Sequence, residues 1–425
     1  MSFNSQNLIT SIRRLLSTCR NSRKGTLTGA LVCSAMLALP VEDSKANDRI
    51  ELIGVGELSG TASDVSGQSD KLENGEPHNR LGGFSALEYS GKEHRYVALP
   101  DRGPDDGATG YQCRYQVLDI DVTPGTDHPI NLKLVDSVML VDEQGRPFTG
   151  SSSAIEPTKS CAVRLDPEGF RFSDNGNFFV SDEYGPQLIE FTSVGKEVKR
   201  FQLPEHLCVA NPSESKAEEN KTNSTGRSSN KGMEGLAISP DKSTLIGVMQ
   251  HVLLQDGERN EDGGVPVGVN CRIVQVDIAT GDVKEFVYQL DASENGLNEI
   301  LAVSPNEFLV IERDHYSGAE AKFKKIMKIN LEGATEVQDI EKLPAGSLPP
   351  SIKPVAKQVL IDFLAPEFKL SVAQLPEKLE GLTLGHTLSD GRQTLLVASD
   401  NDFEAEAPSL IYVFALPGQK NFAAR

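Results

Sequence analysis

One hairpin pattern recurs five times along the chain. Each copy has a turn or a Glu-Gly pair, a short apolar strand, a Pro/Asp/Gly turn, a second apolar strand and a polar or acidic end. Two further runs with alternating apolar and polar residues follow most copies, as in residues 272–290, and predict two more strands. The copies are residues 83–103, 168–185, 234–251, 298–315 and 380–402.

Recurring units of about four strands, with almost no helical periodicity, are typical of a β-propeller, in which each sheet is a blade. We therefore predict an all-β propeller of four-stranded blades. A β-sandwich, the main alternative, does not predict repeated four-stranded units. The terminal runs 49–58 and 409–417 are expected to pair and close the ring. Five blades are visible, and a degenerate sixth within residues 331–375 is the alternative.

Residues 1–46 have the pattern of an export signal. Basic residues precede the apolar run 25–40, and Ser44, Lys45 and Ala46 supply a small-residue cleavage site. The apolar run is shorter than the roughly 20 residues that span a bilayer. We expect a periplasmic or secreted protein whose residues 47–425 form the propeller domain, without a later membrane span. The polar segment 211–231 lacks apolar residues and is predicted to be a disordered insertion.

The formal net charge is −19, which argues against nucleic acid as a partner and favours cations. Cysteines beyond residue 46 are even in number, so an oxidising compartment would permit two disulfides with open connectivity. Cys208 and Cys271 flank the polar insertion and its following hairpin, which makes them one plausible pair. The wide spacing of the cysteines argues against a zinc cluster. The four residues are Cys113, Cys161, Cys208 and Cys271.

The acidic residues at the hairpin ends form the candidate site. A propeller places equivalent hairpin positions on a ring around the channel mouth, so two rings are expected on one face. Each acid alone would equally suit ordinary turn chemistry, so the hypothesis depends on their convergence. The opening positions are Glu168, Glu234, Glu299 and Glu380; the closing positions are Asp101, Asp182, Glu183, Gln250, Glu312, Asp314, Asp400 and Asp402.

Converging carboxylates repel unless a cation offsets them, and calcium takes six to eight oxygen ligands without a fixed geometry. Neighbouring basic residues would allow metal and a small anionic substrate to bind together. We predict Ca²⁺ ligands among Asp182, Glu183, Glu234, Glu312 and Asp400. The predicted catalytic carboxylates are Glu234, Asp101 and Glu312, and the predicted substrate-binding residues are Arg102, Lys231, Arg313 and His251.

Other common chemistries lack their sequence signatures. The chain contains no Gly-x-Ser-x-Gly elbow, Walker A loop or His-Glu-x-x-His motif. It also contains no Trp, so a stacking platform for sugars or bases is not expected.

A set of motifs in fixed order resembles the bacterial phytase-like family, described by the phrase "esterase-like activity of phytase". The motifs are LPDRGP (99–104), SDEYGP (181–186), NKGMEGLAISPD (230–241), LNEILAVSPNEFLVIERD (297–314) and EGLTLGHTLSDGRQTLLVASDNDF (380–403), within a resemblance that spans about 50–417. It implies a secreted or periplasmic propeller related in architecture to calcium-dependent alkaline phytases. It also implies a working face that includes Asp101, Glu183, Glu234, Glu312 and Asp400.

This chain departs from the family at Lys231, where the pattern has Arg; the charge is kept but the bidentate fork is lost. The function expected is metal-assisted hydrolysis of a small phosphoric ester by a monomer. Hydrolysis of carboxylic esters or lactones on the same propeller is one alternative. A non-catalytic propeller that binds a ligand or a protein is the other.

Overall fold

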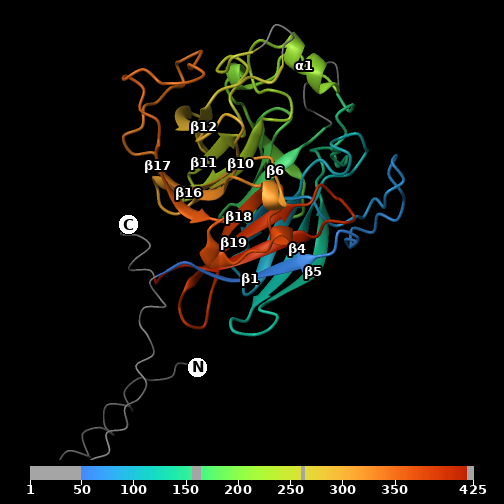
Figure 1. Ribbon diagram of the computed structural model, residues 1–425. Coiled ribbons are helices and arrows are strands. Elements are labelled where there is room, and N and C mark those ends of the chain that lie inside the picture. The colour runs from blue at the N-terminus through green and yellow to red at the C-terminus, as the bar shows by residue number, and fades with distance from the viewer. Residues whose placement is uncertain (1–48, 156–163, 260–263, 419–425) are drawn as a thin grey trace, which may run out of the picture. The chain divides into compact units, whose positions relative to one another are not determined.

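Five four-stranded antiparallel sheets are the blades of a β-propeller (Figure 1). The computed structural model describes residues 49–155, 164–259 and 264–418, so the predicted export signal and Cys161 lie outside the described residues. Blade 1 consists of β2 (Phe84–Tyr89), β3 (Arg95–Pro100), β4 (Arg114–Val122) and β5 (Ile130–Met139). Blade 2 consists of β6 (Pro167–Phe172), β7 (Phe178–Asp182), β8 (Gln187–Phe191) and β9 (Glu197–Phe201).

The other three blades repeat this arrangement. Blade 3 is β10 (Met233–Ile238), β11 (Thr244–Met249), β12 (Asn270–Asp277) and β13 (Val283–Gln289); blade 4 is β14 (Gly296–Ala302), β15 (Glu307–Arg313), β16 (Lys324–Asn330) and β17 (Ala356–Asp362). Blade 5 is β18 (Lys378–Thr387), β19 (Gln393–Asp400), β20 (Ser409–Ala415) and β1 (Glu51–Leu58). The pairing of β1 with β20 confirms that the terminal runs complete one blade.

The predicted propeller is confirmed, and the alternative of a sixth blade is wrong. β17, within residues 331–375, pairs with β16 and completes blade 4. The preceding residues lie along the outer edge of blade 3, where the Val337 N–H donates to Glu285 O at 2.8 Å. Val337, Leu343 and Ile352 form an apolar cluster there with Val287. This segment therefore covers the edge of β13, which would otherwise be exposed.

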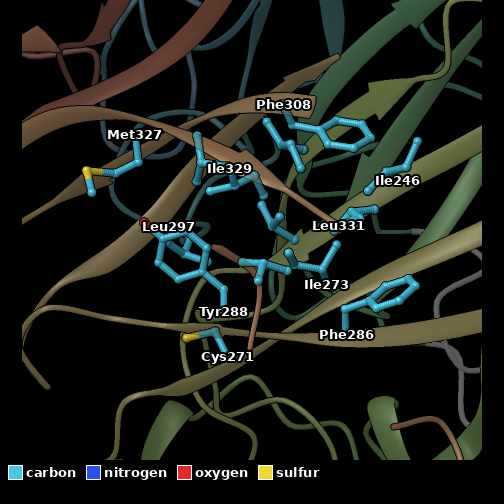
Figure 2. Packing of buried hydrophobic residues seen from close by; sticks show 14 of the residues in the cluster. Ile246, Cys271, Ile273, Phe286, Tyr288, Leu297, Phe308, Met327, Ile329 and Leu331 are labelled. Carbon is cyan, nitrogen blue, oxygen red and sulfur yellow. The ribbon is translucent and has the colours of Figure 1, made fainter. Parts of the chain in front are cut away.

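Apolar side chains fill the interfaces between blades. Between blades 3 and 4, Ile273 and Phe286 pack with Leu297 and Phe308 in one buried cluster (Figure 2). The five innermost strands, which begin the blades, each contact the next one around the ring: β2, β6, β10, β14 and β18. This packing fixes the positions of the inner strands.

The insertion 211–231 differs from the predicted disorder. It contains the helix α1 (Lys216–Thr222), whose N-terminal N–H group on Glu218 is capped by the Ser215 side chain. Arg227 is buried, donates to Tyr184 O at 2.8 Å and pairs with Glu219 of α1. Buried ion pairs thus order a segment that has few apolar residues. Elsewhere in the described residues, the helical turns are the 3₁₀ segments Glu205–Leu207, Gly318–Glu320, Pro366–Phe368 and Val372–Gln374.

The cysteine prediction needs correction. Cys113, Cys208 and Cys271 each carry a free thiol, so the suggested Cys208–Cys271 disulfide is wrong. The three residues lie in different apolar clusters, which keeps their sulfur atoms apart. Among the residues that the structure describes, no helix has the length and apolar character needed to cross a membrane.

Candidate metal and anion site

The pairing of each inner strand with its neighbour has an irregular register at an equivalent position. A β-bulge leaves an extra residue outside the ladder and changes the direction of its side chain. We call the residues at these positions the bulge ring: Ser85, Glu168, Glu234, Asn298 and Glu380. Four of them line one cavity, and Asn298 contacts two of those four.

The three glutamates of the bulge ring converge. Glu168, Glu234 and Glu380 each offer a carboxylate oxygen within 4.8 Å of the others. Burial raises the pKa of all three, and for Glu168 and Glu234 a neighbouring carboxylate is the next cause. Such a group is costly when ionised unless positive charge offsets the repulsion.

Hydrogen bonds hold two of these glutamates in place. Glu234 Oε1 accepts from Gln250 Nε2 at 2.5 Å and from Asn298 Nδ2 at 2.9 Å. Glu380 accepts from Arg313 Nη2 at 2.8 Å, and from Ser85 Oγ at 3.1 Å. Within the described residues, buried Glu234 Oε2 and Asn298 Oδ1 have no hydrogen-bond partner.

Basic side chains from four blades surround the same cavity, whose volume is about 150 Å³. Three are tied to carboxylates: Arg102 to Asp166 and Lys378 to Asp400, both at 2.7 Å, and Arg313 to Glu380 as above. Lys231 Nζ instead donates to the neutral Gln250 Oε1 at 3.1 Å. Burial lowers the pKa of Lys231.

Two further acidic groups lie near this cavity. Asp166 and Glu183 form one with Glu168, and Asp101 forms the other with Asp400 and Asp402. Basic side chains already offset negative charge in both acidic groups, because Arg102 pairs with Asp166, and Lys378 contacts Asp400 and Asp402. Arg313 likewise pairs with Glu380 of the bulge ring, but among the described residues the buried Oε2 of Glu234 and Oδ1 of Asn298 have no hydrogen-bond partner. These unsatisfied oxygens make the glutamates of the bulge ring the best candidate ligands for a metal ion.

The structure brings many of the sequence-predicted site residues to the cavity. Asp400 does not line the cavity itself, but it pairs with Lys378, which does. Of the residues predicted to bind the metal, bind substrate or act in catalysis, those that line it directly are Asp101, Arg102, Glu183, Lys231, Glu234 and Arg313.

Glu312, Asp182 and His251 are not among the cavity-lining residues. Glu312 accepts from Tyr288 Oη at 2.7 Å and from Lys357 Nζ at 3.0 Å, because alternate residues of β15 face opposite sides. Asp182 accepts the backbone N–H groups of Asp166 (2.9 Å) and Gly185 (3.0 Å), so it stabilises the turn after β7. His251 Nε2 lies 2.9 Å from Ser293 O.

Other residues of the site escaped the sequence reasoning. Lys378 and Asp166 each lie two residues before a bulge-ring glutamate, and that regular spacing was the available signal. Asn298, not the predicted Glu299, occupies the bulge position of β14.

Glu299 has a different partner, Arg171. The two side chains are 3.0 Å apart, and Glu299 Oε1 accepts from the Leu236 N–H of β10 at 2.9 Å. The Arg171 guanidinium on β6 donates to Ile300 O at 2.9 Å and to Leu382 O at 3.2 Å, on β14 and β18. It also reaches Leu87 O of β2 at 3.4 Å. This pair therefore ties all five inner strands together.

Comparisons with known proteins identify the family. The chain is similar to an uncharacterized secreted protein of Arthroderma benhamiae, with 28% identity over 53% of this chain and 56% of the relative, so it spans about half of that protein's length. Among solved structures it is similar to the Malassezia sympodialis allergen Mala s 1, with 13% identity, a TM-score of 0.39 and coverage of 83% of this chain and 82% of the allergen. The gluconolactonase XC5397 of Xanthomonas campestris gives 9% identity, a TM-score of 0.35 and coverage of 88% and 93%.

The family described as "Phytase-like: Esterase-like activity of phytase" matches residues 79–403, which include all five inner strands and the whole bulge ring. The match covers most of the chain, from the residues before β2 to those after β19. The chain therefore belongs to the phytase-like family.

Proposed function

We propose that this protein is an exported, metal-assisted hydrolase of phosphoric esters, and that its reaction takes place in the bulge-ring cavity. The observation that supports this most is the meeting of three glutamates within 4.8 Å in a cavity that four basic side chains also line. A carboxylate cluster suits a hard cation, and the basic side chains suit the oxygens of a phosphoryl group. A site with both properties fits an anionic ester bound beside a metal ion.

The residues of the bulge ring fit calcium. Calcium binds carboxylate and amide oxygens in flexible arrangements, and Glu168, Glu234 and Glu380 would supply carboxylates. The orphaned Oε2 of Glu234 is a buried acceptor that a cation would satisfy. A bound calcium ion would screen the carboxylates and polarise a phosphoryl oxygen.

Substrate binding would use the basic side chains. Arg102 and Arg313 present guanidinium groups, which bind two oxygens at once, and Lys231 presents an ammonium that donates to the neutral amide of Gln250. The cavity is small, so a phosphoryl group would enter it and the alcohol part of the ester would remain at the mouth. We also propose that the protein acts as a monomer on a small substrate in the periplasm or outside the cell.

Two carboxyls of the cavity have opposite tendencies, which suits acid–base catalysis. Burial raises the pKa of Glu183, but Arg102, Arg227 and other donors outweigh it, so the net pKa is lowered and the group stays ionised. Burial and the nearby Asp400 raise the pKa of Asp101 well above its usual range, which favours the protonated form. Glu183 would accept a proton from the water that attacks phosphorus. As the phosphorus–oxygen bond to the alcohol breaks, Asp101 would give its proton to the leaving oxygen.

Substrate profiling with and without chelator tests the proposal. Purified protein would be assayed with p-nitrophenyl phosphate, bis-p-nitrophenyl phosphate, phytate and acyl esters, each with calcium and with EDTA. We expect calcium-dependent turnover of at least one phosphoric ester. Turnover of acyl esters alone would replace the proposal with a carboxylic ester or lactone hydrolase. The absence of any chelator-sensitive turnover would leave a binding propeller.

A further inference from the structure

Asn298 is one of two residues of the bulge ring that are not glutamate; the other is Ser85 of blade 1. Blades 2, 3 and 5 place Glu168, Glu234 and Glu380 at the bulge position, while blade 4 places the neutral amide of Asn298 there. This side chain is only 2% exposed, although it carries one donor and one acceptor group. Its two halves have different surroundings.

The amide nitrogen of Asn298 bridges two glutamates. Nδ2 donates to Glu234 Oε1 at 2.9 Å and to Glu380 Oε1 at 3.2 Å. With a cation bound, the two carboxylates are ionised and only accept hydrogen bonds, so the amide nitrogen is the atom that faces them. The position of the amide oxygen is thereby fixed as well.

The amide oxygen has no such partner. Asn298 Oδ1 is buried and, within the described part of the chain, accepts no hydrogen bond. Leaving a buried carbonyl oxygen unsatisfied costs free energy, and Oε2 of Glu234, the residue that accepts from the Asn298 amide nitrogen, has the same defect. A cation bound by both oxygens would satisfy them and also offset the repulsion among the three glutamates, which a neutral water molecule would not do.

We propose that Asn298 is a neutral oxygen ligand of the cation in the bulge ring, and that it holds the ring at three carboxylates so that the site prefers a divalent ion. This inference depends on the cation site of the proposed function. Amide oxygens are ordinary ligands of calcium, and the number of charged ligands tunes the affinity and selectivity of such sites. A fourth carboxylate at this position would favour a more highly charged ion.

Direct metal-binding measurements test the role of Asn298 without reference to turnover. Calcium and terbium would be titrated calorimetrically into chelator-treated full-length protein, as wild type and as the variants Asn298→Ala, Asn298→Asp and Asn295→Ala. Asn295 is a matched control, because it is also a buried asparagine that donates to a glutamate, Glu312, which does not line the cavity. Circular dichroism would check that each variant is folded.

We expect Asn298→Ala to weaken calcium binding by roughly 10-fold or more, as the loss of supporting groups at metal sites does. Asn298→Asp keeps the oxygen, so it should bind calcium at least as tightly as wild type and shift preference toward terbium roughly 10-fold. Asn295→Ala should match wild type. If the amide served only as a donor to the glutamates, Asn298→Asp would lose affinity like Asn298→Ala, and the ligand role would be wrong.

The remaining outcomes separate this inference from the proposed function. Wild-type affinity in Asn298→Ala would remove Asn298 from the ligand set while leaving the metal site in place. Failure of the wild-type protein to bind either ion would overturn both the cation site and the role of Asn298. If Asn298→Ala did not fold, the comparison of Asn298→Asp with wild type would decide the question.

Discussion

Arg313 Nη2 lies 2.8 Å from Glu380 Oε1, and this contact joins the end of β15 in blade 4 to the start of β18 in blade 5. Both side chains are buried. Removing one member of a buried ion pair leaves the other charge uncompensated, at a cost of about 3–5 kcal/mol. We therefore expect Arg313→Gln to lower the free energy of unfolding in urea by about that amount, and to raise KM because a phosphate-binding group is lost.

Arg392 of blade 5 provides the control for that variant. It pairs with Glu51 and Asp390, whose side chains are half exposed, so Arg392→Gln should cost about 1 kcal/mol or less and leave KM unchanged. Equal effects of the two substitutions on stability and KM would show that the Arg313–Glu380 contact has no special role.

The second prediction compares two buried glutamates with different surroundings. Glu234→Gln keeps the shape of the side chain but removes charge from the bulge ring, so we expect turnover to fall about 100-fold or more while the fold is retained. Glu312→Gln removes charge that Lys357 balances outside the cavity, so it should lower stability and keep turnover. Activity assays and urea unfolding of both variants check this. Retained activity in Glu234→Gln would exclude Glu234 from the site.

The third prediction concerns the effect of pH on the pair of Arg171 and Glu299, which ties the five inner strands together. Burial outweighs the attraction of Arg171 and raises the pKa of Glu299 from its ordinary value of 4.5 to about 8. Between these values the folded protein keeps a proton that the unfolded chain releases, so the contribution of Glu299 to stability falls as pH rises.

The variant Glu299→Gln isolates that contribution. As pH rises from 4.5 to about 8, the unfolding free energy of the wild type should fall relative to that of Glu299→Gln. Below pH 4.5 the difference between the two proteins should not change with pH. Urea unfolding across this range in EDTA measures it. A difference that did not change with pH would contradict the raised pKa.

The fourth prediction concerns the thiols. Burial raises the pKa of Cys113 and Cys271 well above the usual range and that of Cys208 to about 11, so the folded protein should react slowly with thiol reagents. Alkylation of the unfolded but unreduced protein should label all three residues, as peptide mass analysis would show. A peptide in which Cys208 is linked to Cys271 would contradict the free thiols.

The repeat pattern was sufficient to predict the blades and the convergence of hairpin ends. It could not decide which of two neighbouring residues faces the cavity. Glu312 and Arg313 are adjacent on β15, and strand alternation sends only Arg313 to the cavity. The choice between Asn298 and Glu299 depends on a bulge, which inserts one residue and shifts the register.

Other parts of the site and fold depend on contacts that no local pattern encodes. The order of segment 211–231 comes from buried ion pairs such as Arg227 with Glu219, so composition alone suggested the opposite. Whether two cysteines meet depends on which interface each blade buries, and neither spacing nor compartment reports that.

The pairing of β1 with β20 makes the site depend on the whole polypeptide. Synthesis delivers β20 after every other strand, so a nascent chain can form its early blades while the fifth still lacks its third strand. A product truncated before Ser409 would leave one edge of β19 bare and β1 without a neighbour, so the blade that carries Glu380 would be incomplete. Translation through β20 is thus a precondition for a complete fifth blade, and with it for full support of the glutamate cluster.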